Sequence, residues 1–358
     1  MENRSYHQQK NIEYTKKLRE FLAELPSYVT SFFRGIEQRT QARSRLAYAN
    51  DIKVFFEWIT RSNPIYEGKE LKSIPASALS NMTAFDIEEY MEYLKLRDVD
   101  DLETVNSEVT IKRKMSALRS LFNYLYRNQI IENNAAIQVE MPKLHDKAIV
   151  RLDIDEVSRF LDVVEYGPQN MSDRKKKFHE LNKIRDLAIM TLLLGTGMRV
   201  SELVGIDIKD LDFDNGRVKV TRKGGYEAYI YFGDEVNEAL GNYLDERELI
   251  KDIKPGHEDA LFLSSRKSRI TVRSIELMVK EYSSYITTVK KITPHKLRST
   301  YGTALYQETG DIYLVADVLG HKDVNTTRKH YAALDEERKL KARDIVRLRT
   351  TADSHEES

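Results

Sequence analysis

"LGHKDVNTTRKHYAAL", residues 319–334, joins a glycine and a histidine to a polar turn, followed by two threonines and a tyrosine. The 358-residue chain contains 20 tyrosines, most of which we expect to be ordinary core or surface aromatics. Tyr331 differs from these because His321 precedes it by ten positions and basic residues lie beside it. A phenol with a pKa of about 10 is protonated at neutral pH, so a tyrosine nucleophile requires a base or strong anion stabilisation nearby.

The composition indicates a helix-rich globular protein that is long enough for two domains. Hydrophobic residues make up 41% of the chain and charged residues 32%, with 15 glycines and 7 prolines, which excludes collagen-like and disordered chains. No apolar run approaches the length of about 18 residues needed to span a bilayer, and the polar N-terminus is unlike a signal peptide. The absence of cysteine excludes disulfides and thiol catalysis. We expect a cytoplasmic protein.

The charge is balanced overall but unevenly distributed. The 57 basic and 57 acidic residues give a net charge of zero. Residues 110–127 carry five basic residues and no acid, and residues 266–298 carry nine basic residues against two acids. Residues 86–108 carry nine acids against two basic residues. Such separated blocks can give a neutral protein one positive face for nucleic acid, although solvated helix faces have the same composition.

Residues 1–140 are predicted to form a helical N-terminal domain that binds DNA. Residues 83–97 begin with Thr83 and have Asp86 three positions later, which is a capping-box pattern. In residues 107–131 the apolar positions repeat at helical spacing, with basic residues mostly on other faces. The same apolar periodicity occurs in residues 44–60, where one face carries Leu46, Ile52, Phe55, Phe56 and Ile59.

A second domain is predicted after an exposed linker at 141–150. This domain spans 151–350, and residues 351–358 are expected to be a disordered tail. It opens with a second capping-box pattern, Asp153 and Glu156. The apolar helix at 184–194 ends at Gly195-Thr196-Gly197.

Glycine-containing turns then predict a small antiparallel sheet, with strands at 217–222 and 227–232. The predicted fold class is therefore mainly α, with two domains and one small antiparallel β-sheet.

Four short segments of the second domain resemble the catalytic domain of the tyrosine site-specific recombinases, the phage integrase family. They are "GTGMRVSEL" (195–203), "TRKGGY" (221–226), "TPHKLRSTYGTAL" (293–305) and "LGHKDVNTTRKHY" (319–331). The N-terminal half also resembles the family's helical core-binding domain, so the likeness covers nearly the whole chain. The residues that carry the resemblance occur in the family's order: Arg199, Glu202, Lys223, His295, Arg298, His321 and Tyr331.

The resemblance implies that Tyr331 is the nucleophile that forms a 3′-phosphotyrosyl intermediate with DNA. Arg199 and Arg298 suit the scissile phosphate, because planar guanidinium groups match its non-bridging oxygens. Lys223, in a hairpin, is implied to protonate the departing 5′-oxygen. A second 5′-hydroxyl then reseals the strand without ATP, in keeping with the absence of a G-x-x-x-x-G-K-[ST] motif.

The remaining residues of the set have supporting roles. By the same resemblance His295 is the base, His321 donates a hydrogen bond to the phosphate, and Glu202 orients the basic cluster. We expect no metal and no cofactor, because the arginines supply the charge stabilisation that Mg²⁺ provides elsewhere.

The partner implied by this chemistry is duplex DNA carrying an imperfect palindromic recombination site. Phosphate contacts from the basic blocks would make affinity dependent on salt, and the helix at 110–127 and residues 266–280 are the expected readers of the major groove. The predicted DNA-binding residues are Arg43, Arg45, Lys112, Arg113, Arg119, Arg266, Arg269 and Arg273.

Within the family, the chain most resembles the Xer branch and its single-recombinase XerS type. The compact length, the segment 1–38 and the sequence "TPHKLRSTYGT" carry this likeness. It implies resolution of chromosome dimers before cell division, a nucleoid-associated homo-tetramer on two DNA sites, and activation by a septal DNA translocase of the FtsK type. The segment "EERKLKARDIVRLRT" (336–350) is implied to dock on a neighbouring protomer.

Three alternatives share parts of this pattern. A mobile-element or phage integrase uses the same chemistry for DNA integration, often with an additional N-terminal arm-binding domain. A type IB topoisomerase relaxes supercoils without site preference. A DNA-binding regulator that has lost catalysis would bind DNA without forming an adduct.

Overall fold

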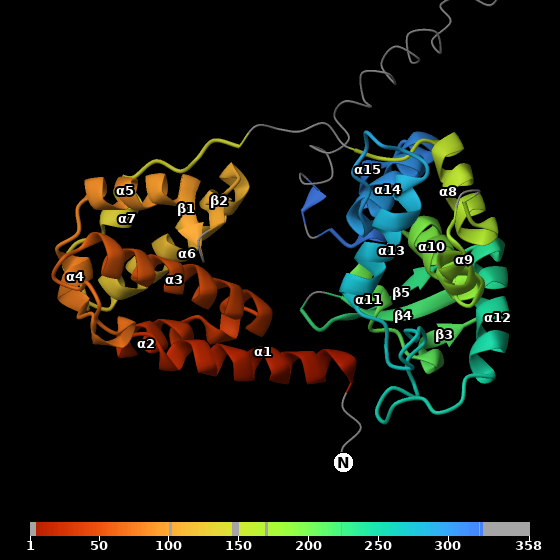
Figure 1. The fold of residues 1–358 in the computed structure, drawn as a ribbon, viewed down its shortest axis with the longest axis horizontal. Helices are drawn as coiled ribbons and strands as arrows, with labels where there is room; N and C mark the ends of the chain where they lie inside the picture. Colours follow the sequence, from red (N-terminus) through yellow and green to blue (C-terminus); the bar gives the residue numbers. More distant parts are fainter. Residues whose placement is uncertain are drawn as a thin grey trace, which may run out of the picture. The chain divides into compact units, whose positions relative to one another are not determined.

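The chain forms two compact units, Met1–Lys147 and Ala148–Ser358, which are drawn together in the computed structural model of Figure 1. The structure describes residues 5–99, 102–144, 150–168, 171–222, 224–321 and 323–324. The division falls inside the range 141–150 of the predicted linker, of which residues 145–149 lie outside the described ranges, so the linker itself stays a prediction.

The first unit is built from helices around one apolar core. Helix α1 packs against α3, and α3 and α2 both pack against α6. The core contains Phe55, Phe56, Tyr90 and Phe122, whose rings meet edge-on at Phe55. The helices are α1 (Tyr6–Ala23), α2 (Ser27–Gly35), η1 (Glu37–Arg39), α3 (Ala42–Ser62), η2 (Leu71–Ser73), α4 (Ala76–Ser80), α5 (Ala84–Lys95), α6 (Glu108–Arg127) and α7 (Ala135–Gln138).

Local sequence accounts for the position and orientation of these helices. The predicted capping box at the start of α5 is confirmed: the Thr83 N–H donates to Asp86 at 2.7 Å, and the Asp86 N–H donates back to the Thr83 hydroxyl at 3.4 Å. At the start of α6 the Ser107 hydroxyl accepts from the Thr110 N–H at 3.4 Å, a one-way N-cap. The predicted inward faces of α3 and α6 are also confirmed, since their apolar positions are buried, apart from the partly buried Leu46.

The prediction that residues 1–140 are helical throughout is wrong at one place. Strands β1 (Leu96–Val99) and β2 (Leu102–Val105) form an antiparallel hairpin in which Leu96 pairs with Val105. Each strand has only four residues, too few to show a clear period of two, and the segment lies in the acidic block. Leu96 and Val105, which pair across the hairpin, are 55% and 76% exposed, so these two apolar side chains do not mark a core face.

The second unit consists of helices with a three-stranded antiparallel sheet of order β3-β4-β5. Helix α10 packs against α8, α12 and α14, and α14 packs against α15. The mainly α class and the one small antiparallel sheet predicted for this unit are thereby confirmed, and the β1–β2 hairpin of the first unit is a second sheet that was not predicted. The elements are α8 (Ile154–Tyr166), α9 (Asp173–Glu180), α10 (Lys183–Thr196), α11 (Val200–Leu203), η3 (Ile208–Asp210), β3 (Leu211–Asp212), β4 (Arg217–Thr221), β5 (Glu227–Tyr231), α12 (Asp234–Glu248), α13 (Val272–Ser284), α14 (Pro294–Thr309) and α15 (Ile312–Leu319).

Several predicted boundaries of this unit are confirmed. Asp153 and Glu156 form the capping box of α8, with reciprocal bonds of 3.0 and 2.9 Å. Helix α10 ends at Gly197, which adopts the left-handed conformation (φ 61°) that ends many helices. Strands β4 and β5 pair from Arg217–Tyr231 to Thr221–Glu227, as the turn glycines predicted. In the described part of the chain, no helix has both the length and the apolar character needed to cross a membrane.

Candidate active site

Arg199 is held in place by Glu202 at the start of the short helix α11. The Arg199 backbone N–H donates to Glu202 Oε2 at 2.8 Å, and its Nη1 donates to Glu202 Oε1 at 2.8 Å. Glu202 is buried, with 3% of its side chain exposed, whereas 33% of the Arg199 side chain is exposed. A buried carboxylate that accepts two bonds from one residue fixes the direction of the guanidinium, and this contact is compatible with the orienting role predicted for Glu202.

Arg298 joins three elements from inside the unit. It lies on α14, is 5% exposed, and donates through Nη1 to the carbonyl of Gly197 at 2.7 Å. Its Nη2 donates to the carbonyl of Leu319, the last residue of α15. One guanidinium therefore satisfies carbonyls at the C-terminal ends of α10 and α15, which have no partner within their own helices.

These contacts bring the two predicted phosphate-binding arginines together. Arg199 Nη2 donates to the carbonyl of Gly320 at 3.1 Å. Gly320 directly follows Leu319, whose carbonyl accepts from Arg298. The next residue, His321, is half-buried. Its backbone N–H donates to the carbonyl of Ala316 at 2.8 Å. The end of α15 thus brings Arg199 and Arg298 into one basic cluster, and His321 is the next residue along the chain.

His295 lies three residues before Arg298 on α14 and is exposed. Residues three apart on a helix lie on neighbouring parts of one face. The spacing of His295 from Arg298 on α14 is therefore compatible with its predicted role as a base near the arginines.

Gly197 and Gly320 are required by their backbone conformation and by neighbouring side chains that lie too close for a Cβ atom. Gly197 has φ 61°, and a Cβ there would lie 2.4 Å from the Tyr301 ring. Gly320 has φ 62° and ends α15. A side chain at either position would disturb the meeting point of α10, α14 and α15.

Two predicted catalytic residues, Lys223 and Tyr331, lie outside the described residues. The segment 336–350 and the tail 351–358 also lie outside them. Their roles stay predictions. Within the described ranges, no group of three or more histidine or acidic side chains is arranged to hold a metal ion.

The three predicted DNA-binding residues of the second unit differ in their surroundings. Arg266 is exposed, and Arg273 is exposed in the first turn of α13, 3.4 Å from Glu276. Arg269 instead donates to the carbonyls of Val204 and Ile206, at 3.1 and 2.8 Å, and pairs with the carboxylate of Asp207. The structure gives Arg269 a role in holding the loop after α11.

In the first unit, Arg45 and Arg119 also bind groups of the protein. Arg45 is 8% exposed and forms an ion pair of 2.5 Å with Glu37. Arg119 donates to the carbonyls of Ala136, at 2.9 Å, and Val139, so it ties α6 to the segment around α7. Arg43, in the first turn of α3, is exposed.

A buried carboxylate supports the basic face of α6. Asp51 is fully buried on α3 and pairs with Arg113 and with Lys114, whose Nζ lies 3.0 Å from it. Burial lowers the pKa of Lys114, and the Asp51 carboxylate opposes this effect. Lys114 belongs to the core, whereas Arg113 keeps 47% of its side chain exposed and Lys112 is half-buried.

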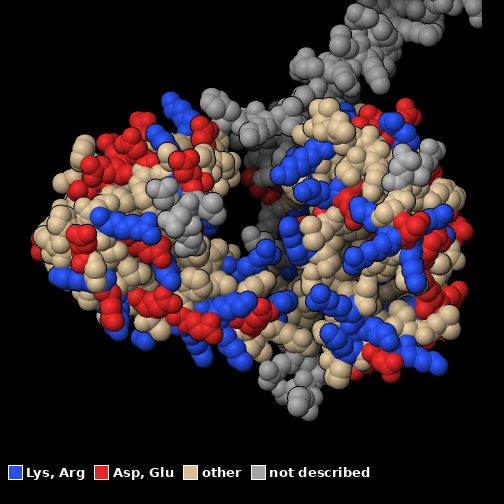
Figure 2. Space-filling model, viewed as in Figure 1, with Lys and Arg blue, Asp and Glu red and all other residues tan. Residues whose placement is uncertain are grey.

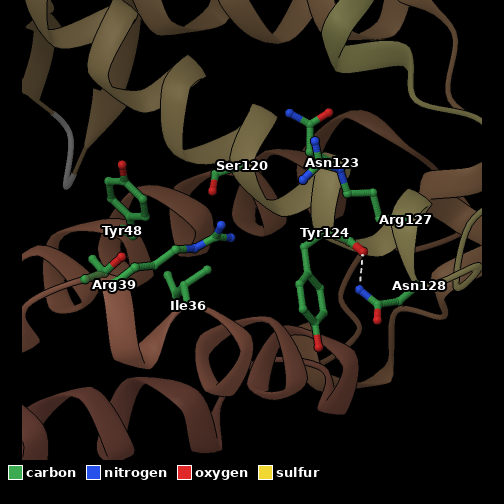
Figure 3. Close-up of a pocket in the computed structure, with 9 residues that line it drawn as sticks. Ile36, Arg39, Tyr48, Ser120, Asn123, Tyr124, Arg127 and Asn128 are labelled. Carbon is green, nitrogen blue, oxygen red and sulfur yellow. Dashed lines mark hydrogen bonds between the residues drawn. The ribbon is translucent and has the colours of Figure 1, made fainter.

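The sequence analysis missed a polar pocket of about 300 Å³ in the first unit, lined by residues of η1, α3 and α6 among others and shown in Figure 3. Arg39 extends between Tyr48 and Tyr124, and Arg127 lies beside Asn123. Asn134 donates to the Asn123 Oδ1 at 2.8 Å, so Asn123 presents its NH₂ group as a donor. The lining holds two guanidinium groups and no carboxylate, which suits an anion. It consists of Ile36, Arg39, Thr40, Tyr48, Ser120, Asn123, Tyr124, Arg127 and Asn128.

Sequence spacing gave little indication of this pocket. Arg39 and Ser120 are 81 positions apart and lie on η1 and α6. The basic block at 110–127 includes Arg127 at its end, and that was the one available signal.

The charge distribution within each unit follows the sequence blocks. In the space-filling view of Figure 2, acidic side chains gather in the first unit over α5, within the acidic block 86–108. Basic side chains are abundant on the visible face of the second unit.

Comparison with known proteins assigns both halves of the chain. The pattern of the phage integrase family matches residues 150–338, and that of the phage integrase N-terminal SAM-like domain matches residues 29–129. Tyrosine recombinase XerS of Streptococcus thermophilus is 32% identical over 350 residues, covering 90% of this chain and 96% of the relative. The same enzyme of Streptococcus agalactiae has the same identity and coverage.

Solved structures share the fold. The recombinase XerH bound to palindromic difH substrate, in a post-cleavage complex, has a TM-score of 0.62 and 21% identity, with 93% of this chain and 94% of that chain covered. The Tn1549 transposon integrase in complex with circular intermediate DNA has a TM-score of 0.61 and 20% identity, with 88% and 99% covered.

The two domain matches cover most of the chain, and the identity to curated relatives extends over nine-tenths of it. The chain belongs to the phage integrase family and is a tyrosine recombinase, an enzyme that breaks and rejoins DNA.

Proposed function

We propose that the basic cluster at the end of α15 binds the scissile phosphate and that Tyr331 attacks it. The observation that carries this assignment is the position of Arg199 and Arg298 on the consecutive carbonyls of Gly320 and Leu319. A guanidinium has five N–H groups, so the bonds from Arg199 to Glu202 and Gly320 do not exhaust its donors. Positive charge held in advance at a phosphate stabilises the transition state without reorganisation.

The proposed reaction conserves the phosphodiester bond. The Tyr331 oxygen attacks phosphorus, its proton passes to His295, and the bond to the 5′-oxygen breaks. Lys223 gives that oxygen a proton, which leaves a 3′-phosphotyrosyl ester and a free 5′-hydroxyl. Attack by the 5′-hydroxyl of another strand reverses these steps, so neither ATP nor water is consumed. His321 donates a hydrogen bond to the phosphate throughout.

DNA contact in the first unit is proposed for the exposed basic residues and the polar pocket. Arg43 and Arg113 are exposed, Lys112 is half-buried, and the pocket adds Arg39 and Arg127. In the second unit the same role is proposed for Arg266 and Arg273. The internal bonds of Arg45, Arg119 and Arg269 favour a supporting role, in which these side chains hold the segments that carry the DNA contacts.

The proposed biological role is resolution of chromosome dimers before cell division. The curated relatives named XerS match 90% of this chain, and that likeness supports the Xer type. The proposed substrate is an imperfect palindrome on which four protomers join two DNA sites at the nucleoid. The segment 336–350 would dock on a neighbouring protomer, and a septal DNA translocase of the FtsK type would activate exchange.

The test uses a genomic library of short duplexes, each carrying a nick that traps cleaved DNA. Wild-type protein and Tyr331→Phe are incubated with the library without metal or ATP, and covalently bound DNA is sequenced. We expect adducts with the wild type alone, on one imperfect palindrome near the chromosome terminus.

Other outcomes correspond to the alternatives. Adducts at the ends of a mobile element would replace dimer resolution by integration. Adducts on unrelated sequences would indicate a topoisomerase. Binding without an adduct in either protein would contradict catalysis at Tyr331.

Assembly is tested on the recovered site by deleting residues 336–358. The truncated protein is expected to cleave a single site but to join two sites poorly, as measured by native gel electrophoresis of paired duplexes. Full strand exchange by the truncated protein would contradict the proposed docking.

A further inference from the structure

Arg222 connects the β4–β5 hairpin to the end of α15. It follows the last residue of β4 and directly precedes Lys223. Its Nη2 donates to the carbonyl of Val318 at 3.2 Å, and its Nη1 lies 3.5 Å from the carbonyl of Asp317. The hairpin and the helix are 95 positions apart at this contact, so only tertiary packing brings them together.

The same helix end is bound by three arginines. Arg222 binds the carbonyls of residues 317 and 318, Arg298 binds that of 319, and Arg199 binds that of 320. The last carbonyls of a helix lack partners in the helix and carry its negative end, so cations are favourable there. Two of the three arginines belong to the proposed phosphate site. The third belongs to the strand end beside Lys223.

The contact is close and leaves little space. A Cβ on Gly320 would lie 2.0 Å from Arg222 Nη1, so a glycine at this position leaves room for the guanidinium. Arg222 Nε is buried and makes no hydrogen bond to the described residues. A surface arginine that merely rested on the helix would keep this nitrogen in water.

The backbone of Arg222 also closes the turn after β4. Its N–H donates to the carbonyl of Tyr226 at 2.7 Å, and its carbonyl accepts from the N–H of Gly225 at 3.0 Å. Lys223 lies between these residues in the chain. Arg222 therefore makes two connections: its side chain contacts α15, and its backbone closes the turn.

We propose that Arg222 is a positioning residue, which fixes the turn containing Lys223 against the end of α15 that carries His321. This inference rests on the proposed role of Lys223 as proton donor to the 5′-oxygen. In this arrangement one helix end sets the position of both the phosphate-binding arginines and the turn that carries the acid. Loss of Arg222 would chiefly impair the proton transfer.

The test compares two substrates that differ in one atom. In the second substrate, sulfur replaces the bridging 5′-oxygen at the scissile phosphate of the recovered site. A thiol is far more acidic than an alcohol, so the sulfur departs without a proton and no longer needs a general acid. Single-turnover cleavage is measured on both substrates for the full-length wild type, Arg222→Ala, Arg222→Lys and Lys223→Ala.

Arg217→Ala is the matched control, because Arg217 is the first residue of β4, the strand that Arg222 follows. It pairs with Asp212 at 2.7 Å and covers the Tyr229 ring, and its described contacts do not include α15. We expect this variant to cleave both substrates at nearly the wild-type rate.

Arg222→Ala is expected to cleave the natural substrate about 10- to 100-fold more slowly and the sulfur substrate within about threefold of wild type, as for loss of a general acid. Lys223→Ala should show the same pattern, with a larger loss of cleavage rate on the natural substrate. Arg222→Lys should be intermediate, because it retains charge but loses the planar fork. It also keeps the test valid if the alanine variant does not fold.

Two outcomes would overturn the inference in distinguishable ways. If Lys223→Ala recovers on the sulfur substrate and both Arg222 variants stay slow, Arg222 does not act through the acid. If Lys223→Ala does not recover either, the proposed role of Lys223 is wrong and the inference is lost with it.

Discussion

At the scale of single residues, the candidate active site contains arginines that donate hydrogen bonds to backbone carbonyls in the absence of substrate. Arg298 satisfies Gly197 and Leu319 from a buried position, and Arg199 is oriented by the buried Glu202. Helix ends that would otherwise carry unpaired carbonyls are stabilised by the same groups that are proposed to bind phosphate. Folding therefore prepares the positive charge of the site.

Arg298→Lys tests this dual role. A lysine ammonium is a point charge and cannot span the two carbonyls that the guanidinium joins. We expect cleavage to fall by about 10²–10³-fold, as for loss of one preorganised donor, and unfolding free energy to fall by about 1–3 kcal/mol from the unpaired buried carbonyl. Adduct formation and urea unfolding are measured.

The control for this prediction is Arg159→Lys, which changes an exposed arginine of α8. It should leave both quantities unchanged. Wild-type cleavage by Arg298→Lys would show that the fork geometry is not required.

At the scale of secondary-structure elements, short-range signals set the helix boundaries. The boxes of Thr83–Asp86 and Asp153–Glu156 mark the starts of α5 and α8, and Gly197 marks the end of α10. The hairpin β1–β2 had no such signal, because strands of four residues are too short to show a clear period of two. Strand β3, with two residues, was not predicted for the same reason of length.

The Asp153 cap of α8 should make the stability of the protein depend on pH. The hydrogen bond from the Glu156 backbone N–H holds the pKa of Asp153 below its ordinary value of 3.8. The folded state therefore binds this proton less tightly than the unfolded state, so the cap stabilises above the ordinary pKa. That contribution is lost as the pH falls through the lowered folded value.

Asp153→Asn removes this titration while keeping an amide that can cap. The wild type should be more stable than the variant near neutral pH, and the difference should shrink below about pH 4. Urea unfolding followed by circular dichroism measures both proteins across this range, with Asp155→Asn as a control for charge in the same turn. A difference that stays constant with pH would exclude the proposed cap titration.

At the scale of the whole molecule, a neutral chain can bind DNA because charge is segregated within its units. The acidic block lies over α5 and β1–β2, whereas α6 presents Arg113 and Lys112 and ends at the pocket with Arg127. Affinity should therefore depend on a limited set of phosphate contacts and not on net charge.

The double change Arg39→Gln and Arg127→Gln tests the pocket as a phosphate site. Binding of full-length protein to a duplex is followed by fluorescence anisotropy at several salt concentrations. The slope of log K against log salt should decrease by about 1–2, since each lost phosphate contact contributes about 0.9.

Lys72→Gln removes an exposed charge of η2 outside the pocket and is the matched control. Its slope should equal that of the wild type. An equal decrease in both proteins would indicate general charge loss instead of a site.

Sequence patterns were enough to predict the helical class, the inward faces of α3 and α6, the capping boxes, the β4–β5 hairpin and the ordered motif of the family. Apart from the ordered motif, whose residues span positions 199–331, these features depend on residues a few positions apart, where propensity, period and capping act. Tertiary packing alone set which of the predicted DNA-binding arginines stay exposed, because Arg45, Arg119 and Arg269 are bound by groups that packing brings to them. It likewise decided the pocket and the contact of Arg222 with α15, since these join residues about 80 to 100 positions apart whose proximity follows from burial of the core and not from local pattern.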